Sequence, residues 1–171
     1  MTLVAALLWL LIAQSPAGAS PASDEGTFVA LINDYRASNG LPALVVDNQL
    51  TGLARQWAGN MAARDTLDHA GDLSVGVSTD WDVLGENVGV HSVHDLTALF
   101  QAFVASPGHR ANLLDPRFDY VGVGVVHGPD GKIWTTHRFR SVPGSIAPPP
   151  PPPTTPPPAP TAPPTVPPAP A

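Results

Sequence analysis

Residues 121–139 read VGVGVVHGPDGKIWTTHRF, and this stretch decides which fold class the chain predicts. Its first part alternates valine with glycine, which is the two-residue period of a β-strand. Gly122 and Gly124 carry no side chain, so a helix can pack closely against that face. The tetrapeptide GPDG at residues 128–131 is a hairpin turn signal, and the alternation resumes over residues 133–139. The stretch therefore predicts two antiparallel strands.

Three segments with helical periodicity precede this hairpin. Apolar side chains recur every three to four positions over residues 23–40 and again from Asp47 to about Arg64. Asp47 is a good N-cap for the second of these helices. A third helix is expected from Asp95 to the residue before Pro107, because proline cannot continue a helix. Helices followed by a hairpin predict an α+β sandwich with a small antiparallel sheet.

The two ends of the chain differ in composition from this folded part. Residues 1–19 combine a short apolar run with a small-x-small ending, which predicts a secretory signal peptide. An uncleaved membrane anchor is the alternative interpretation, although the run is too short to span a bilayer comfortably. Residues 143–171 consist largely of proline, alanine and threonine, and they predict a disordered, proline-rich tail. The folded domain is therefore expected over residues 20–142 of a secreted or cell-wall-associated protein.

Composition narrows the classes of function. The sequence contains no cysteine, so an apolar core must stabilise an exported domain without disulfide bonds. The net charge is −6 and Lys132 is the only lysine, which argues against binding to nucleic acid or to anionic membrane surfaces. We expect no stable membrane span once the signal peptide is cleaved.

One polar pocket is indicated by three short segments. Glu86 lies in the apolar stretch LGENV and is one of only two glutamates in the chain, so it does not read as a routine solubilising charge. His109 follows a glycine in the segment SPGHRAN, and His69 lies upstream in LDH. Two imidazoles and one carboxylate are a donor set that can hold Zn²⁺ with an open coordination position.

The same segments resemble the bacterial branch of the CAP superfamily, whose shared unit is also called the SCP domain. The resemblance rests on the Gly-Glu-Asn segment at 85–87, on FVASPGHRANLL at 103–114 and on VGVG at 121–124. The opening helix segment LINDYRASNGL at 31–41 is similar as well. The match covers residues 26–141. It implies an α-β-α sandwich with a surface cleft that, in some members, binds a divalent metal such as zinc.

Carried over by position, the resemblance implies that His69, Glu86 and His109 line this cleft. They are the candidate ligand-binding residues and the candidate ligands of Zn²⁺ or another divalent cation. Many eukaryotic members have a second glutamate late in the third helix, where this chain reads FVAS at 103–106 without an acid. A second interpretation is a metal-free polar cluster in which Glu86 orients one of the histidines.

Other candidates have simpler interpretations. His91 and His94 are expected to be an exposed loop pair, and His137 a histidine on a strand face. Ser106 lies three residues before His109, so a serine nucleophile with a histidine base is conceivable. Asn112 and its neighbour Arg110 are expected to clamp the turn through hydrogen bonds. Trp57, Trp81 and Trp134 are expected in the core or in the cleft wall.

The sequence thus predicts an exported binding protein whose ligand is a divalent metal, another small molecule, a lipid or a cell-wall glycan. An alternative is a metal-assisted or serine-type hydrolase that uses the same cleft. A third interpretation makes the proline-rich tail the functional part of a structural cell-wall protein.

Overall fold

The computed structural model describes residues 19–78 and 80–144. The predicted tail lies outside these residues from position 145 onward, and so does the predicted signal peptide up to residue 18. No helix in the described ranges is both long enough and apolar enough to cross a membrane.

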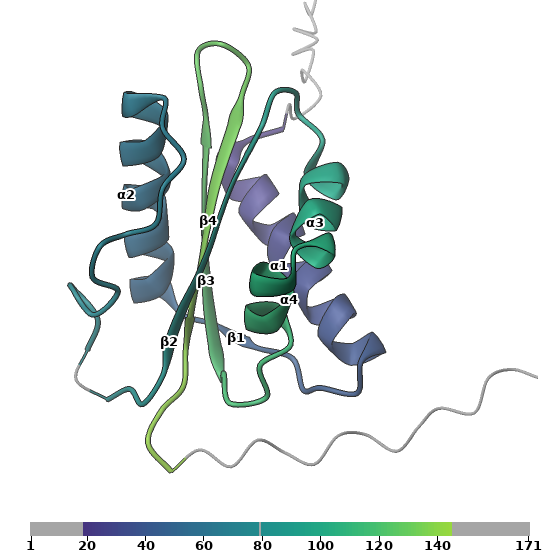
Figure 1. The fold of residues 1–171 in the computed structure, drawn as a ribbon, viewed down its shortest axis with the longest axis vertical. Helices are drawn as coiled ribbons and strands as arrows, with labels where there is room; N and C mark the ends of the chain where they lie inside the picture. Colours follow the sequence, from purple (N-terminus) through teal and green to yellow (C-terminus); the bar gives the residue numbers. More distant parts are fainter. Residues whose placement is uncertain (1–18, 79, 145–171) are drawn as a thin grey trace, which may run out of the picture.

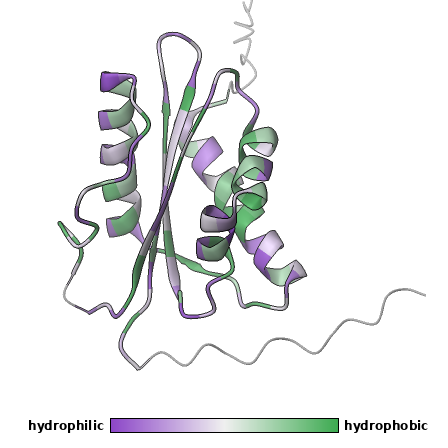
Figure 2. Cartoon of the chain, viewed as in Figure 1, coloured by the Kyte–Doolittle hydropathy of each residue, from purple (hydrophilic) through white to green (hydrophobic). Residues whose placement is uncertain are grey.

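The described chain forms three layers, with a sheet between helices (Figure 1). Helix α2 (Asn48–Arg64) covers one face of the sheet, whereas α1 (Pro21–Ser38), α3 (Leu96–Ala105) and α4 (Pro107–Leu113) cover the other. This arrangement confirms the predicted α+β fold and its α-β-α layering. In Figure 2, α3 is hydrophobic along most of its length, while α2 carries hydrophobic and hydrophilic residues in alternation.

The sheet has four strands in the order β1-β3-β4-β2. The predicted hairpin is present as β3 (Tyr120–His127) and β4 (Ile133–Arg140), and β2 (Leu84–His91) pairs with β4 in antiparallel orientation. The sequence pattern did not predict two of these pairings. Strand β2 runs through the Gly-Glu-Asn segment, and the short β1 (Val45–Val46) adds a parallel strand to β3, so the sheet is mixed.

Gly122 and Gly124 allow α2 to approach β3 as the pattern indicated. A Cβ atom added at either glycine would overlap backbone atoms of α2, at Leu50 and Thr51 for the first and at Ala54 and Arg55 for the second. The helix therefore lies directly on the backbone of the strand.

The segment after α3 differs from the expected helix stop. Pro107 does end α3, but it also occupies the first turn of α4, where a missing N–H costs no hydrogen bond. The main core lies between the sheet and α1, α3 and α4, and it includes Phe28, Phe103 and Leu113. Trp134 belongs to a smaller cluster on the α2 side, with Trp57 packed against it.

Candidate functional site

His69 and Glu86 meet although they lie in different parts of the chain. His69 is in the loop after α2, with 58% of its side chain exposed, and Glu86 is on β2 and almost fully buried. The Nδ1 atom of His69 lies 2.9 Å from Oε1 of Glu86. Because an ionised carboxylate only accepts hydrogen bonds, Nδ1 carries the proton and donates it. In the neutral form of the ring, the other nitrogen, Nε2, then keeps its lone pair.

Both oxygens of the Glu86 carboxylate have partners. Besides His69, Oε1 accepts a hydrogen bond of 3.0 Å from the backbone N–H of Ala70. Oε2 lies 2.8 Å from Nε of Arg138, an ion pair whose N–H is not aligned as a hydrogen bond. Arg138 is the cross-strand neighbour of Glu86 on β4, and both side chains are buried. The carboxylate is therefore a support for His69 in this conformation, without a free oxygen turned toward a ligand.

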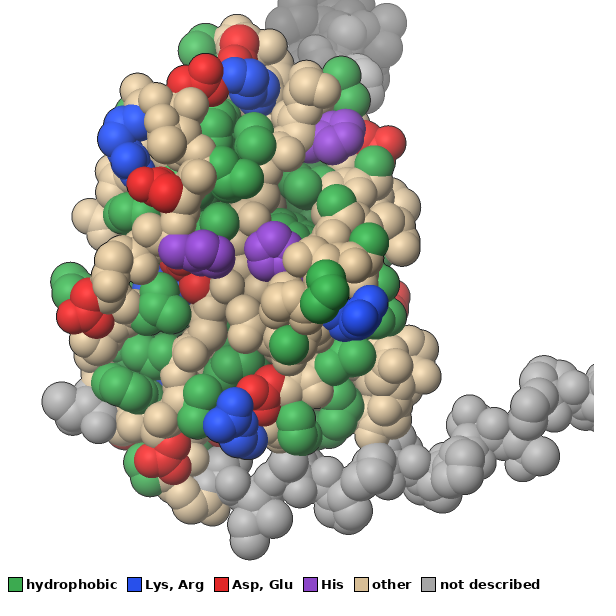
Figure 3. Space-filling model, viewed as in Figure 1, with side chains coloured by type: hydrophobic (Ala, Val, Ile, Leu, Met, Phe, Trp, Pro, Cys, Tyr) green, Lys and Arg blue, Asp and Glu red, His purple; other side chains and the backbone are tan. Residues whose placement is uncertain are grey.

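His109 completes the group from the opposite side. It lies in α4, and its ring centroid is 6.5 Å from that of His69. The ring meets Phe103 edge-on at 5.0 Å. Partial burial lowers the pKa of His109 below its usual value, and the nearby charge of His69 lowers it further. Within the described ranges no hydrogen bond reaches either ring nitrogen of His109. The predicted residues His69, Glu86 and His109 thus lie together. Histidine side chains gather in this way near the centre of the face in Figure 3.

Two asparagines hold α4 against β2 and so position His109. Asn112 donates from Nδ2 to the backbone oxygen of Glu86 at 3.0 Å and to Oδ1 of Asn87 at 2.9 Å. Asn87 in turn donates to the backbone oxygen of His109 at 3.1 Å. Arg110 donates to the carbonyl of Val104 at the end of α3. Arg110 thus clamps the turn as expected, whereas the hydrogen bonds of Asn112 reach β2 instead of the turn.

Gly85 precedes Glu86 because nothing larger fits. A Cβ atom there would lie 2.7 Å from the ring of Phe118 and 3.2 Å from Oδ1 of Asn112. A side chain would displace the ring of Phe118 and crowd the amide of Asn112, which places His109. Each residue of the Gly-Glu-Asn segment therefore has its own role. Gly85 allows close packing, Glu86 accepts a hydrogen bond from His69, and Asn87 donates one to the backbone of α4.

A cavity of about 270 Å³ opens beside this group. Arg138, the partner of Glu86, forms part of its wall, and so does Ala70, which follows His69. Trp57 also lines the cavity. Its Nε1 donates to the backbone oxygen of Asp68 at 2.9 Å, so the N–H already has a partner and the ring is the part that can contact a ligand. The remaining lining residues are Leu53, Gln56, Asn60, Gly71, Asp72 and Val75.

The remaining histidines occupy unlike environments. Nδ1 of His91 lies 2.9 Å from the backbone oxygen of Val93, and His91 is the last residue of β2, whereas an exposed loop pair with His94 was expected. His94, its expected partner, instead contacts Asp24, and so does His127. Among the described residues, Asp24, His94 and His127 form the one group of three potential metal ligands whose donor atoms all lie within 4.8 Å of one another. Sequence reasoning missed this group because its members lie 70 and 103 positions apart.

Serine chemistry has no geometric support in the described part of the chain. Ser106 is the N-cap residue of α4, its side chain makes no capping hydrogen bond, and no hydrogen bond joins it to a histidine ring. The serine-type arrangement weighed from the sequence is therefore not assembled in this conformation.

Comparison with known proteins identifies the family. The model of the CAP family, described as the cysteine-rich secretory protein family, matches residues 29–137. This chain belongs to the CAP family. The match spans most of the described fold, from α1 to the middle of β4, and it includes His69, Glu86 and His109. Membership does not depend on cysteine, since this CAP domain has none.

Bacterial relatives share the CAP domain of this chain. YkwD of Bacillus subtilis (strain 168) is 30% identical over 128 residues, which are 70% of this chain and 48% of that protein. An extracellular SCP-domain protein of Bacillus anthracis is 27% identical, with a TM-score of 0.62, over 71% of this chain and 41% of that one. The chain therefore spans about half the length of these relatives.

The fold itself recurs at lower identity. An outer surface protein of Borrelia burgdorferi has a TM-score of 0.66 at 17% identity, and the match covers 72% of this chain and 96% of that one. Such a likeness shows a shared fold alone. Because the match covers nearly all of the Borrelia protein, this fold makes up almost the whole of that chain.

Proposed function

We propose that this CAP domain is an exported binding module whose ligand is held between His69 and His109, with Glu86 supporting His69 from behind. The ligand class that the donor atoms favour is a divalent cation such as Zn²⁺, alone or with a small molecule attached. One observation carries the proposal: the buried Glu86 accepts from Nδ1 of His69 and thereby leaves Nε2 available, in a ring whose centroid lies 6.5 Å from that of His109.

The support that Glu86 gives His69 is the arrangement expected behind a histidine ligand. A histidine that binds a metal through one nitrogen commonly donates from the other to a carboxylate, which fixes the tautomer and the ring orientation. Here the Nδ1 proton is held by Glu86, whose charge is balanced by Arg138. The predicted set of three ligands is thereby refined: the two histidines bind directly, and Glu86 acts through His69.

The lowered pKa of His109 suits the same role. A metal ligand must be neutral, and the partial burial of His109 favours its neutral imidazole. Two protein ligands leave coordination positions open for water or for a donor group of a second molecule. The cavity beside Arg138 provides room for the rest of such a molecule.

The walls of that cavity favour a polar ligand over a lipid. Gln56, Asn60 and Asp72 supply hydrogen-bonding groups, and Trp57 supplies one aromatic face. An aromatic ring combined with amides and a carboxylate is chemistry that binds a sugar ring. A cell-wall glycan is therefore our candidate for the molecule beside the cation.

Three comparisons agree with this proposal. NaASP2, a protein of the same fold with a TM-score of 0.53 at 13% identity, has been solved with Zn²⁺. The Bacillus anthracis relative is described as extracellular, and the family description is of secretory proteins. We place this protein outside the cell on the same grounds, with its proline-rich tail as a spacer.

Zinc titration of the full chain by calorimetry near pH 7.5 tests the proposal. We expect His69→Ala and His109→Ala each to weaken binding at the cleft at least about tenfold, and Glu86→Gln to weaken it by about 10- to 100-fold, because supporting carboxylates contribute that much to affinity. His91→Ala removes an imidazole whose Nδ1 contacts a backbone carbonyl and serves as the control. His94→Ala separates any zinc held at the Asp24 group from zinc in the cleft.

Two results would contradict the proposal. The first is zinc binding that is unchanged in both cleft variants while circular dichroism shows them folded. The second is the absence of any cleft binding in the wild-type chain.

A further inference from the structure

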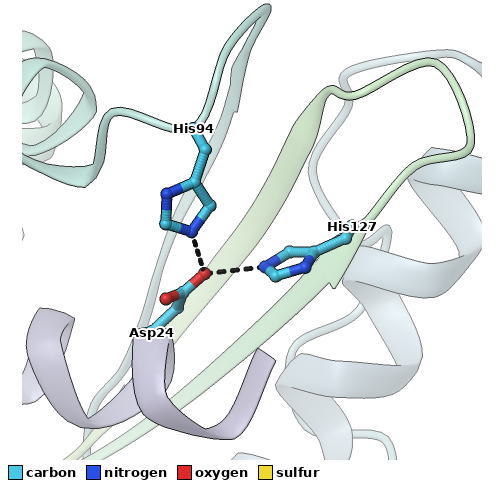
Figure 4. Close-up of side chains that lie close together, drawn as sticks. All are labelled: Asp24, His94 and His127. Carbon is cyan, nitrogen blue, oxygen red and sulfur yellow. Dashed lines mark hydrogen bonds and ion pairs between the residues drawn. The ribbon is translucent and has the colours of Figure 1, made fainter. Parts of the chain in front are cut away.

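Asp24, His94 and His127 converge at a second place in the molecule, away from the cleft (Figure 4). The Nε2 atoms of both histidines lie 2.7 Å from the same oxygen, Oδ2 of Asp24. The two rings are perpendicular, with centroids 5.4 Å apart. In the described ranges no hydrogen bond, ion pair or ring contact joins these residues to His69, Glu86 or His109. The group is therefore a separate site.

Three different elements bring these side chains together. Asp24 lies in the first turn of α1, His127 is the last residue of β3, and His94 precedes Asp95, the N-cap of α3. Helix α1 packs on β3, so the start of the helix and the end of the strand are held in register by the core. The packing of the fold therefore sets the positions of Asp24 and His127, and His94 reaches them from the loop before α3.

The burial of Asp24 distinguishes the group from ordinary surface charges. Its side chain is only 4% exposed, whereas those of His94 and His127 are 43% and 31% exposed. A buried carboxylate needs a counter-charge or several donors, and the first turn of a helix supplies part of that stabilisation. Glu25, the adjacent acid, does not compete for the same donors, because Arg55 pairs with both of its oxygens at 2.8 Å and 2.6 Å.

We infer that Asp24, His94 and His127 form a binding site for a divalent transition-metal ion. Their donor atoms, two imidazole nitrogens and one carboxylate oxygen, all lie within 4.8 Å of one another. Donors around a tetrahedral Zn²⁺ stand about 3.3 Å apart when each bond is about 2.05 Å. The present spacing of 2.7 Å between nitrogen and oxygen therefore needs an opening of about 0.6 Å, which side-chain rotation provides.

The donor set selects the class of ion. Imidazole nitrogen suits Zn²⁺, Co²⁺, Ni²⁺, Cu²⁺ and Fe²⁺, whereas Mg²⁺ and Ca²⁺ prefer all-oxygen sites. Three protein ligands leave at least one position open for water or an exogenous ligand. The exposed edges of His94 and His127 give an ion an entry path from solvent.

The competing explanation is a purely structural tie in which Asp24 accepts two hydrogen bonds. Glutamine at position 127 separates the two explanations, because its amide can donate to Asp24 but is a poor ligand for zinc. If the group is only a structural tie, the His127→Gln variant should keep the stability of the wild-type chain. If the group binds zinc, the same variant should lose zinc binding.

The test is a titration of the full chain with Zn²⁺ and, separately, with Co²⁺, whose visible absorption reports coordination by nitrogen. It is run on the His69→Ala/His109→Ala double variant, so that metal in the cleft does not contribute. We expect one equivalent of metal to bind, and we expect His94→Ala or His127→Gln added to that background to weaken binding at least about 100-fold, more than the loss of a supporting residue. His91→Ala, at the end of β2 and three positions before His94, is the matched control and should bind as before.

Thermal melting supplies the second readout. Zinc at about 100 times its Kd should raise the Tm by several degrees in the double variant, and the rise should vanish when His127→Gln is added. Binding that is unchanged by His94→Ala and His127→Gln would overturn the inference. So would failure of the folded double variant to bind either metal, and that result would leave the proposed function of the cleft intact.

Discussion

His137 is the residue whose charge state the fold controls most strongly. It lies fully buried on β4, its ring centroid is 4.9 Å from those of Phe28 and Phe103, and neither ring nitrogen has a hydrogen-bond partner within the described ranges. Burial, helped by the charge of His109, lowers the pKa of His137 to about 3. The sequence predicts a histidine on a strand face at this position, and His137 does lie on β4. The alternation of a strand does not reveal that both faces of this sheet are covered.

This lowered pKa predicts how stability depends on pH. Between pH values of about 6.5 and 3, the unfolded chain protonates His137 and the folded chain does not. The free energy of unfolding should therefore fall as the pH falls through this window. Its slope against pH measures how many protons are taken up on unfolding, and His137 should contribute about one of them. Urea unfolding at several pH values measures the slope. His137→Leu should reduce it by that proton, and an unchanged slope would show that the imidazole is not buried neutral.

At the scale of elements, the contact of α2 with β3 depends on glycines in the strand. The period of residues 121–125 indicated the strand and the close approach of a helix, and both are confirmed. Neither β2 nor α4 could be predicted in the same way. Strand β2 contains Glu86 and Asn87, two residues that are rare in strands but are satisfied here by His69, Arg138 and Asn112. Helix α4 begins at a proline that reads equally well as an ending.

Two glycine substitutions test this contact, and we expect them to change the free energy of unfolding in opposite directions. Gly124→Ala should lower the free energy of unfolding by about 2–3 kcal/mol, because the new methyl group would overlap the backbone of α2 at Arg55. Gly52→Ala, within α2 itself, has no atom within 4 Å of the added Cβ and should raise stability by about 0.5–1 kcal/mol. Urea unfolding measures both. A neutral Gly124→Ala would mean that α2 does not sit directly on β3.

At the scale of the whole molecule, one buried arginine links segments that are distant in the chain. Arg36 of α1 is fully buried and donates to the carbonyls of Pro42, Leu113 and Asp115 at 2.9–3.0 Å. It thereby joins α1 to the loop that follows it and to the end of α4, the helix that carries His109. Its effect on the cleft is indirect, through the position of α4.

Removing this link should destabilise the entire domain. We expect Arg36→Met to lower the free energy of unfolding by about 3 kcal/mol or more, because three buried or partly buried carbonyls lose a charged donor. Arg117→Met is the matched control: Arg117 pairs with Asp115, but its side chain is 63% exposed, so the expected change is below about 1 kcal/mol. Chemical denaturation of both variants makes the comparison, and equal losses would contradict the linking role of Arg36.

The sequence by itself determined the features that repeat over short distances. Helical periodicity placed α1, α2 and α3, alternation with glycine placed the hairpin, and the segments around Glu86 and His109 pointed to the CAP family and its cleft. These signals are local because a helix or a strand repeats its apolar face every few residues.

Only the tertiary structure decided what meets across long separations. It made Glu86 a support for His69, it buried His137 among aromatic rings, and it joined Asp24 to His94 and His127 over 70 and 103 positions. No short-range pattern carries such information, because the distance between two side chains on different elements is set by how those elements pack and not by their spacing in the chain.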